Sequence, residues 1–102
     1  MKKPKANKNG NGHVAAIRIE FHDAVAATVA IAGTFNEWHP DASPMLRVGP
    51  DRWVKDLALP PGNYEYRLVV DGIWMPDPSA RETVPNQFGE QNSVLNVKAS
   101  PA

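Results

Sequence analysis

Two tryptophans stand at polar positions that the hydrophobic pattern of the chain does not explain. Trp38 lies in a loop of Asn, Glu, His and Pro, and Trp74 follows an Asp-Gly turn. Large rings at wet positions serve as contact surfaces, because one face can pack on an apolar partner or on the C–H face of a sugar ring. Arg67 is expected beside Trp74, where its N–H groups can bond hydroxyls. These residues alone indicate either a sugar-binding surface or a protein–protein interface.

The sequence gives less support to a catalytic site or a metal site than to a binding surface. The histidines are scattered over expected strand ends and loops, without a second ligand at helical spacing, which favours ordinary surface side chains: His13, His22 and His39. Asp71 and Asp77 flank Trp74, and two carboxylates around a bound sugar can form a hydrolytic pair. However, the Asp-Gly turn already explains Asp71, and Asp77 belongs to an Asp-Pro pair of the kind that commonly begins a loop. The chain has no cysteine, which excludes a disulfide, a thiolate zinc site and a thiol nucleophile. We therefore expect no enzyme activity, no cofactor and no metal.

The length and charge of the chain limit its class. A chain of 102 residues forms a single domain with one modest core. Residues 1–12 hold four lysines and no acid, whereas the remainder holds seven basic and eleven acidic residues, a net charge of −4. A mildly acidic folded part argues against nucleic acid as a partner. No run approaches the roughly 18 apolar residues of a membrane helix, and no apolar segment follows the basic start, so we expect a cytoplasmic protein without membrane contact.

Three regions are expected along the chain. Residues 1–12, rich in Lys, Asn and Gly, cannot bury an apolar face and are predicted to form a disordered basic tail. Residues 13–98 carry the apolar patterning and form the folded domain. Residues 99–102 are expected to be a free C-terminal end.

The clearest element is a strand, a tight turn and a second strand over residues 63–74. Large apolar side chains alternate with residues of the opposite face, the period of a half-buried strand: Tyr64, Tyr66, Leu68 and Val70 against Glu65, Arg67, Val69 and Asp71. The dipeptide Asp71-Gly72 supplies the two positive φ angles of a type I′ turn. The pattern predicts a hairpin with Arg67 and Trp74 together on the outward face.

Further strands are expected over residues 14–21, 25–32, 45–48, 53–59 and 92–97, with turns of Gly, Pro and Asp between them. Trp53 falls on the alternating face of its strand and is expected in the core. Residues 75–91 show little periodicity, and loops of this length are usually functional or disordered. About seven short strands without a helical pattern predict an all-β antiparallel sandwich.

Several segments together resemble one known family. They are Val29 to Trp38 (VAIAGTFNEW), Pro44-Met45, Leu59 to Arg67 (LPPGNYEYR), Val70 to Trp74 (VDGIW), Asp77-Pro78 and Gly89 to Val94 (GEQNSV). In order and spacing they resemble a family 48 carbohydrate-binding module, the early-set domain found ahead of the catalytic barrel in branching and isoamylase-type debranching enzymes. They are also similar to the glycogen-binding domain of the AMP-activated protein kinase beta subunit. The resemblance implies an immunoglobulin-like sandwich that binds α-1,4-glucan without cutting it.

The resemblance also implies a set of sugar contacts. Trp38 and Trp74 match the two Trp platforms, and Asn92 matches the Asn of the closing motif. Arg67 stands where the kinase-type domain has Lys, and Phe88 where it has an apolar loop-tip residue. Asn36 and Asp71 are expected to form turns.

The sequence is compatible with two functions. One is a stand-alone, non-catalytic module for glycogen, starch or maltooligosaccharides. The alternative is a docking or scaffold domain for a separate glucan-metabolising enzyme or kinase-type partner, in which the Trp surface is the interface.

Overall fold

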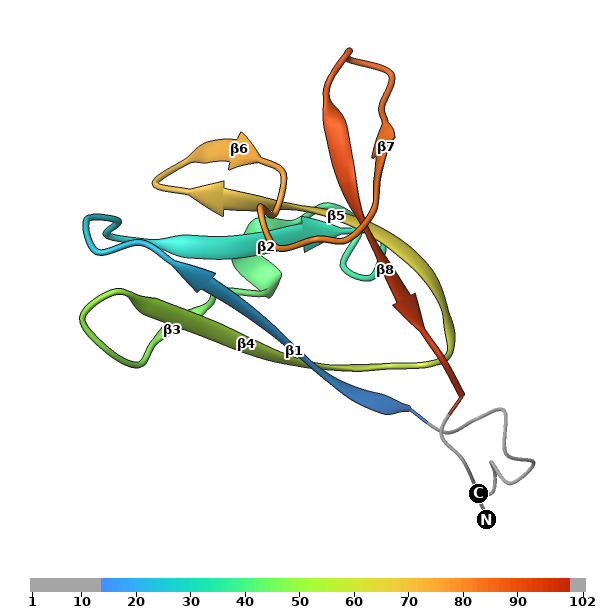
Figure 1. Ribbon diagram of the computed structural model, residues 1–102, viewed down its shortest axis with the longest axis horizontal. Helices are drawn as coiled ribbons and strands as arrows, with labels where there is room; N and C mark the ends of the chain where they lie inside the picture. Colours follow the sequence, from blue (N-terminus) through green and yellow to red (C-terminus); the bar gives the residue numbers. More distant parts are fainter. Residues whose placement is uncertain (1–13, 100–102) are drawn as a thin grey trace.

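The computed structural model describes residues 14–99, and the tail predicted for residues 1–12 lies outside this range. Two antiparallel sheets face each other (Figure 1). The three-stranded sheet has the order β1 (Ala15–His22), β4 (Arg52–Leu59) and β3 (Leu46–Arg47). The five-stranded sheet has the order β2 (Val29–Gly33), β5 (Gly62–Val70), β8 (Gln91–Val97) and β7 (Thr83–Pro85), and β6 (Ile73–Met75) also pairs with β5. The predicted antiparallel sandwich is confirmed, with eight strands and one 3-10 turn, η2 (Pro40–Ala42), in the described range.

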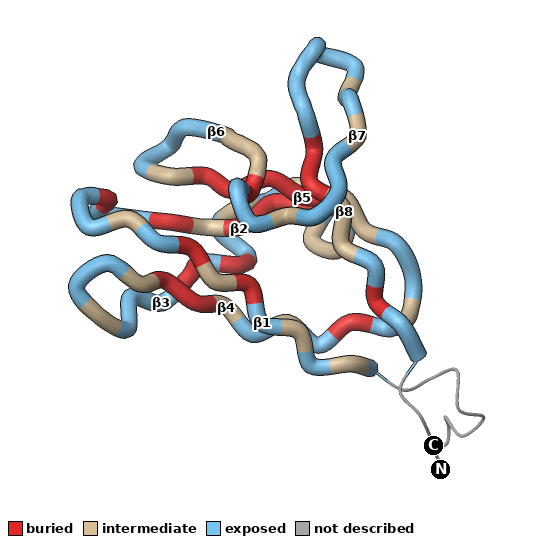
Figure 2. Tube along the Cα trace, viewed as in Figure 1, coloured by how far each residue is buried: buried red, intermediate tan, exposed pale blue. Residues whose placement is uncertain are grey.

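The core lies between the inner faces of the sheets, and the period of two decides its members (Figure 2). Phe21 and Trp53 stand opposite each other in β1 and β4, and both are almost fully buried. Ile31 and Leu68, also cross-strand neighbours, face them from the other sheet with no exposed surface. Burial of each such side chain contributes about 1.5–3 kcal/mol. The core position predicted for Trp53 is confirmed.

The strand predicted over residues 25–32 begins later, at Val29, so this prediction was wrong for its first half. Asp23 Oδ1 accepts the backbone N–H groups of Val25 and Ala26, both at 2.8 Å. Asp71 Oδ1 accepts those of the next two residues, at 2.9 and 2.8 Å. These amides are therefore bonded to side chains instead of a neighbouring strand, and Val25 remains 90% exposed despite its apolar side chain.

The long loop predicted over residues 75–91 contains secondary structure of its own. The three residues of β7 pair with β8, from Thr83 opposite Ser93 to Pro85 opposite Gln91. The pair forms a hairpin that projects from the sandwich (Figure 1). Three residues are too few to produce a recognisable period in the sequence.

A buried polar cluster fixes the segment between β6 and β7. The Tyr66 hydroxyl donates to Asp77 Oδ2 at 2.6 Å, and the Asp77 N–H donates to Ser93 Oγ at 2.8 Å. Both Tyr66 and Asp77 are at most 5% exposed. Burial, followed by the hydrogen bond to Asp77, raises the pKa of Tyr66 above its ordinary value. The Asp77 carboxylate is therefore held by the core and does not face the Trp74 side chain as one half of a hydrolytic pair.

The turn between β5 and β6 has the predicted type I′ signature, with φ of 50° at Asp71 and 83° at Gly72. The Asp71 carboxylate accepts the backbone N–H groups of Thr28 and Ala27, which lower its pKa below the ordinary value. The predicted role of Asp71 as a turn former is confirmed.

This contact predicts a pH-dependent stability difference between the protein and an Asp71→Asn variant, which keeps the acceptor oxygen but not the charge. A depressed folded-state pKa stabilises the fold above the unfolded value of about 3.9, and this contribution is lost as the pH falls through the folded pKa. We expect the variant to melt at a lower temperature at neutral pH and the gap to close below about pH 4. Thermal melts of both proteins between neutral pH and pH values below about 4 measure this difference in melting temperature. A difference that is independent of pH would contradict a depressed pKa of Asp71.

The two ends of the folded part emerge together. Ala15 pairs with Leu59, and Val97 pairs with Gly62, which follows Leu59 by three positions in the chain. The loops that join β1 to β2, β3 to β4 and β5 to β6 gather at the opposite end, on the left in Figure 1. Within residues 14–99, no helix is long and apolar enough to cross a membrane.

Candidate functional site

The outward face of the five-stranded sheet carries the predicted contact residues. Glu65, Arg67 and Val69 alternate with the core residues of β5 and point away from the sandwich. Ala32 lies opposite Arg67 in the neighbouring strand β2 and is fully buried. Trp74, in β6, lies opposite Val69 of β5, so the two side chains share one face of the sheet. The predicted pairing of Arg67 and Trp74 on one face is confirmed.

Trp38 reaches the same face from the loop after β2. Asn36 organises this loop: its Oδ1 accepts the Gly33 N–H at 2.9 Å, and its Nδ2 donates to Ile31 O at 2.9 Å and to Ser43 Oγ at 3.0 Å. Trp38 itself adopts the left-handed region, with φ of 61°. Such a conformation is uncommon for a bulky residue and persists only where its surroundings enforce it. The predicted turn-forming role of Asn36 is confirmed.

Gly33 allows the loop to leave the sheet. A Cβ at this position would lie 2.6 Å from Glu65 O and 2.8 Å from the Tyr66 Cβ. The Thr34 N–H donates to the same Glu65 O at 2.9 Å. Only glycine permits so close an approach of the two strands.

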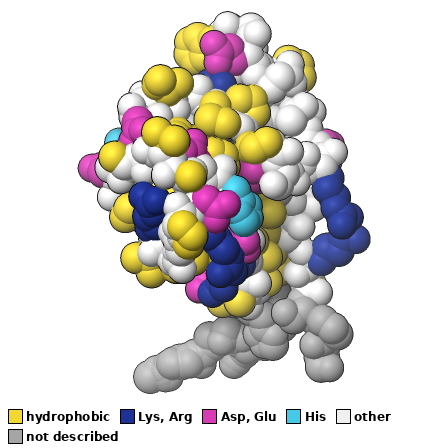
Figure 3. Space-filling view, turned by 60° about the vertical axis from the view of Figure 1, so that its left-hand side comes forward, with side chains coloured by type: hydrophobic (Ala, Val, Ile, Leu, Met, Phe, Trp, Pro, Cys, Tyr) yellow, Lys and Arg dark blue, Asp and Glu magenta, His cyan; other side chains and the backbone are white. Residues whose placement is uncertain are grey.

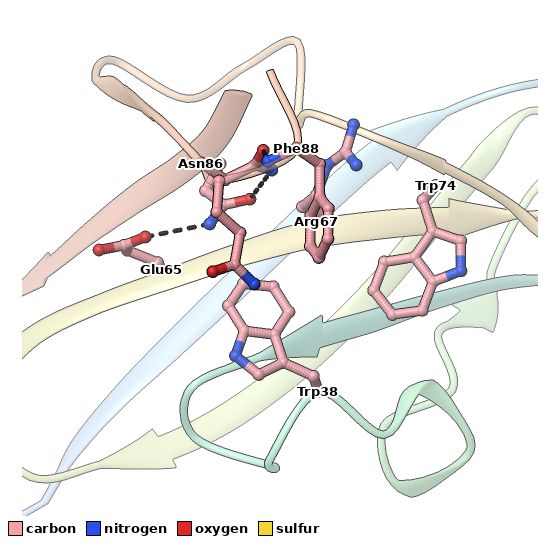
Figure 4. A pocket seen from close by; sticks show the side chains of 8 residues that line it. Trp38, Glu65, Arg67, Trp74, Asn86 and Phe88 are labelled. Carbon is pink, nitrogen blue, oxygen red and sulfur yellow. Dashed lines mark hydrogen bonds between the residues drawn. The ribbon is translucent and has the colours of Figure 1, made fainter. Parts of the chain in front are cut away.

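These elements enclose a cavity of about 470 Å³ (Figure 4). Its lining comprises Trp38, Glu65, Arg67, Trp74, Asn86, Gln87, Phe88 and Asn92. All five residues taken from the family resemblance are among them, brought together from the loop after β2, from β5, from β6 and from the β7–β8 hairpin. The other three, Glu65, Asn86 and Gln87, were not identified from the sequence as site residues. The alternation of β5 could have indicated Glu65, whereas Asn86 and Gln87 lie in the segment without a period.

The cavity has an aromatic rim and a polar floor. Phe88 is 78% exposed and Trp74 is 40% exposed, which is unusual for rings of this size. Arg67 and Asn92 are 9% and 6% exposed. The rings can therefore contact a ligand over their faces, while the polar groups approach it from below.

Hydrogen bonds tie the hairpin tip to the floor. Arg67 Nη2 lies 2.8 Å from Glu90 Oε1. Asn92 Nδ2 donates to Glu65 Oε1 and Asn86 Nδ2 donates to Asn92 Oδ1, both at 3.0 Å. Asn86 Oδ1 in turn accepts the backbone N–H groups of residues 88 and 90, at 2.9 and 3.0 Å. The position of Phe88 is thus set by polar contacts with the sheet.

The arrangement suits recognition of a polar ring compound. Flat aromatic faces beside N–H donors match the alternating C–H faces and hydroxyls of a sugar. Neither described histidine lies in the cavity: His22 belongs to β1, and His39 contacts the Asn36 backbone. Within residues 14–99, no group of three or more His, Asp or Glu side chains could hold a metal ion.

Comparisons with known proteins place the chain in a family. Residues 15–102 match the family described as the glycogen recognition site of AMP-activated protein kinase. The chain is 39% identical over 72 residues to the human 5'-AMP-activated protein kinase subunit beta-2, a match that covers 71% of this chain and 25% of that protein. It is 37% identical over 70 residues to subunit beta-1 from Sus scrofa, covering 69% of this chain and 54% of that sequence.

The chain thus spans about a quarter of the length of the beta-2 relatives that it matches. The family match covers the whole described range after its first residue, including every strand and every residue that lines the cavity. The chain belongs to the family of glycogen recognition domains of AMP-activated protein kinase, the carbohydrate-binding module type that its motifs resemble.

Proposed function

We propose that this domain binds α-1,4-glucan, such as glycogen, starch or maltooligosaccharides, without cutting it. The observation that supports this most strongly is the cavity itself, which joins three aromatic side chains to a buried Arg and Asn. The family match supports the choice of a glucan over other sugars. The buried position of Asp77 and the use of Asp71 by backbone amides support a non-catalytic role.

In this proposal the rim and the floor have different tasks. Trp38 and Trp74 stack on successive glucose rings, and Phe88 closes over the end of the chain from the hairpin. Arg67 and Asn92 donate N–H groups to hydroxyls from the floor. A half-open site with few contacts must offset the ordering of a flexible sugar, so the affinity is modest.

The first test is a titration with maltoheptaose, followed by tryptophan fluorescence, with β-linked cellohexaose as the control sugar. Two of the three tryptophans line the cavity and the third is buried in the core, so a signal change reports on the site. A saturable change with the α-linked sugar alone is expected. No change with either sugar at millimolar concentration would overturn the proposal.

A second candidate function is docking to a kinase-type partner, since the relatives are subunits of a protein kinase. Exposed apolar side chains occur at the loop end of the sandwich, where the Arg47 side chain and the Asp71 carboxylate join the loops. Figure 3 shows apolar and charged side chains mixed over this side. The exposed members are Val25, Leu46, Val48 and Ile73. Capture of a purified kinase catalytic subunit that is lost in a Val25→Asp/Ile73→Asp variant, with sugar binding retained, would support it.

A further inference from the structure

Glu65 occupies a position in the cavity that the family resemblance does not assign. It lies on β5 beside the base of the Trp38 loop, where its backbone oxygen accepts the Thr34 N–H at 2.9 Å. Its side chain lines the same cavity as Trp38, Arg67 and Asn92 and is half-buried. The carboxylate therefore belongs to the same cavity as the Trp38 ring, at its margin (Figure 4).

Asn92 fixes the orientation of this carboxylate. One Asn92 N–H donates to Glu65 Oε1 at 3.0 Å, while the Asn92 oxygen accepts from Asn86 at 3.0 Å. Because Asn92 is only 6% exposed, its own position is set by packing as well as by these bonds. A chain of three polar side chains thus holds Glu65 in one conformation, as a preorganised binding group requires.

Most of the acceptor capacity of Glu65 is unused. An ionised carboxylate accepts about four hydrogen bonds, and the bond from Asn92 is the one that its side chain receives within residues 14–99. In the same range it has no ion-pair partner. The nearby cation, Arg67, is paired with Glu90 at 2.8 Å. A carboxylate that lacks further donors and lies in a half-open cavity leaves acceptor positions for hydroxyl groups of a ligand.

We propose that Glu65 binds hydroxyls of the glucan directly and makes the site selective for neutral glucose units over phosphorylated ones. This inference rests on the proposed function. Two adjacent hydroxyls of a glucose ring can donate to one carboxylate, and a charged acceptor strengthens such bonds. A phosphate group on the sugar would be repelled by the Glu65 carboxylate, and the Arg67 cation that lines the same cavity is already paired with Glu90.

The test compares the unaltered protein with Glu65→Gln, which has nearly the same shape but lacks the charge and one acceptor oxygen. We expect the variant to bind maltoheptaose about tenfold more weakly, which corresponds to about 1.4 kcal/mol, since hydrogen bonds to charged groups are stronger than those between neutral groups. We also expect its preference for maltoheptaose over a maltooligosaccharide bearing one 6-phosphate to decrease. Glu82→Gln is the matched control, because Glu82 bonds Asn96 and does not line the cavity.

Equal affinity of Glu65→Gln and the unaltered protein for maltoheptaose would overturn the inference while leaving glucan binding intact. Absence of maltoheptaose binding by the unaltered protein would overturn the proposed function instead. A second measurement uses only the unaltered protein, so it tests the inference even if the Glu65→Gln variant does not fold. The carboxylate carbon resonance of Glu65 should shift on addition of maltoheptaose, and an unchanged resonance at saturation would also overturn the inference.

Discussion

Replacement of Trp38 by alanine is expected to weaken maltoheptaose binding by about thirtyfold or more and to leave the sandwich folded. Central aromatic side chains of a binding site typically contribute 2 kcal/mol or more, and 1.4 kcal/mol corresponds to a factor of ten in affinity. The ring of Trp38 lines the cavity and lies outside the core cluster of buried residues. Under the proposed function its loss removes a contact with the sugar, while the packing between the sheets stays unchanged.

Isothermal titration with maltoheptaose measures this effect, and thermal unfolding of the same sample checks the fold. Ile73→Ala is a suitable control, because this apolar side chain is 70% exposed and does not line the cavity. The control should bind as the unaltered protein does. An unchanged affinity of Trp38→Ala would remove this residue from the site and with it the first stacking position.

The second large effect is expected for Gly33→Ala, which should reduce both stability and sugar affinity. The added methyl group would meet backbone and Cβ atoms of β5 at 2.6–2.8 Å, and these atoms cannot move without shifting the strand. Overpacking of this kind costs about 1–3 kcal/mol. For a domain of this size, each kcal/mol lowers the melting temperature by about 4–8 °C. Because the Trp38 loop starts at this glycine, the platform should shift as well.

Gly49→Ala provides the matched control for this substitution. The nearest atom to a Cβ at Gly49 is the Arg52 Cβ at 3.8 Å, an ordinary contact. Thermal melts of both variants should show a large loss for Gly33→Ala and little change for Gly49→Ala. Equal melting temperatures would show that the close approach of the strands at Gly33 is not needed for the fold.

Local patterns were sufficient to predict the elements that carry the site. The alternation in residues 64–71 decided which side chains of β5 face outward, and Asp71-Gly72 decided the turn type, because both depend on neighbouring residues alone. The family motifs named five residues that line one cavity although they come from four separate segments. Their role in sugar binding remains a prediction.

Other features depend on contacts between distant parts of the chain, so the sequence could not reveal them. The apolar run from Val25 suggested a strand. In the structure the backbone N–H groups at its start donate to the carboxylates of Asp23 and Asp71 and so are not available to a neighbouring strand. The strand β7 exists because it pairs with β8. The contact between Asn92 and Glu65, which are 27 positions apart, follows from strand pairing and side-chain packing together.

The first and last strands, β1 and β8, meet the rest of the fold on either side of one short turn, and this affects how the domain can be joined to another protein. Ala15 and Val97 leave the sandwich beside Leu59 and Gly62, which are separated by two prolines. Neighbouring ends let a domain be inserted into a surface loop of a host protein at little cost in loop-closure entropy. Polypeptide joined at Ala15 and at Val97 would then hold the domain from the same end, next to the turn between β4 and β5.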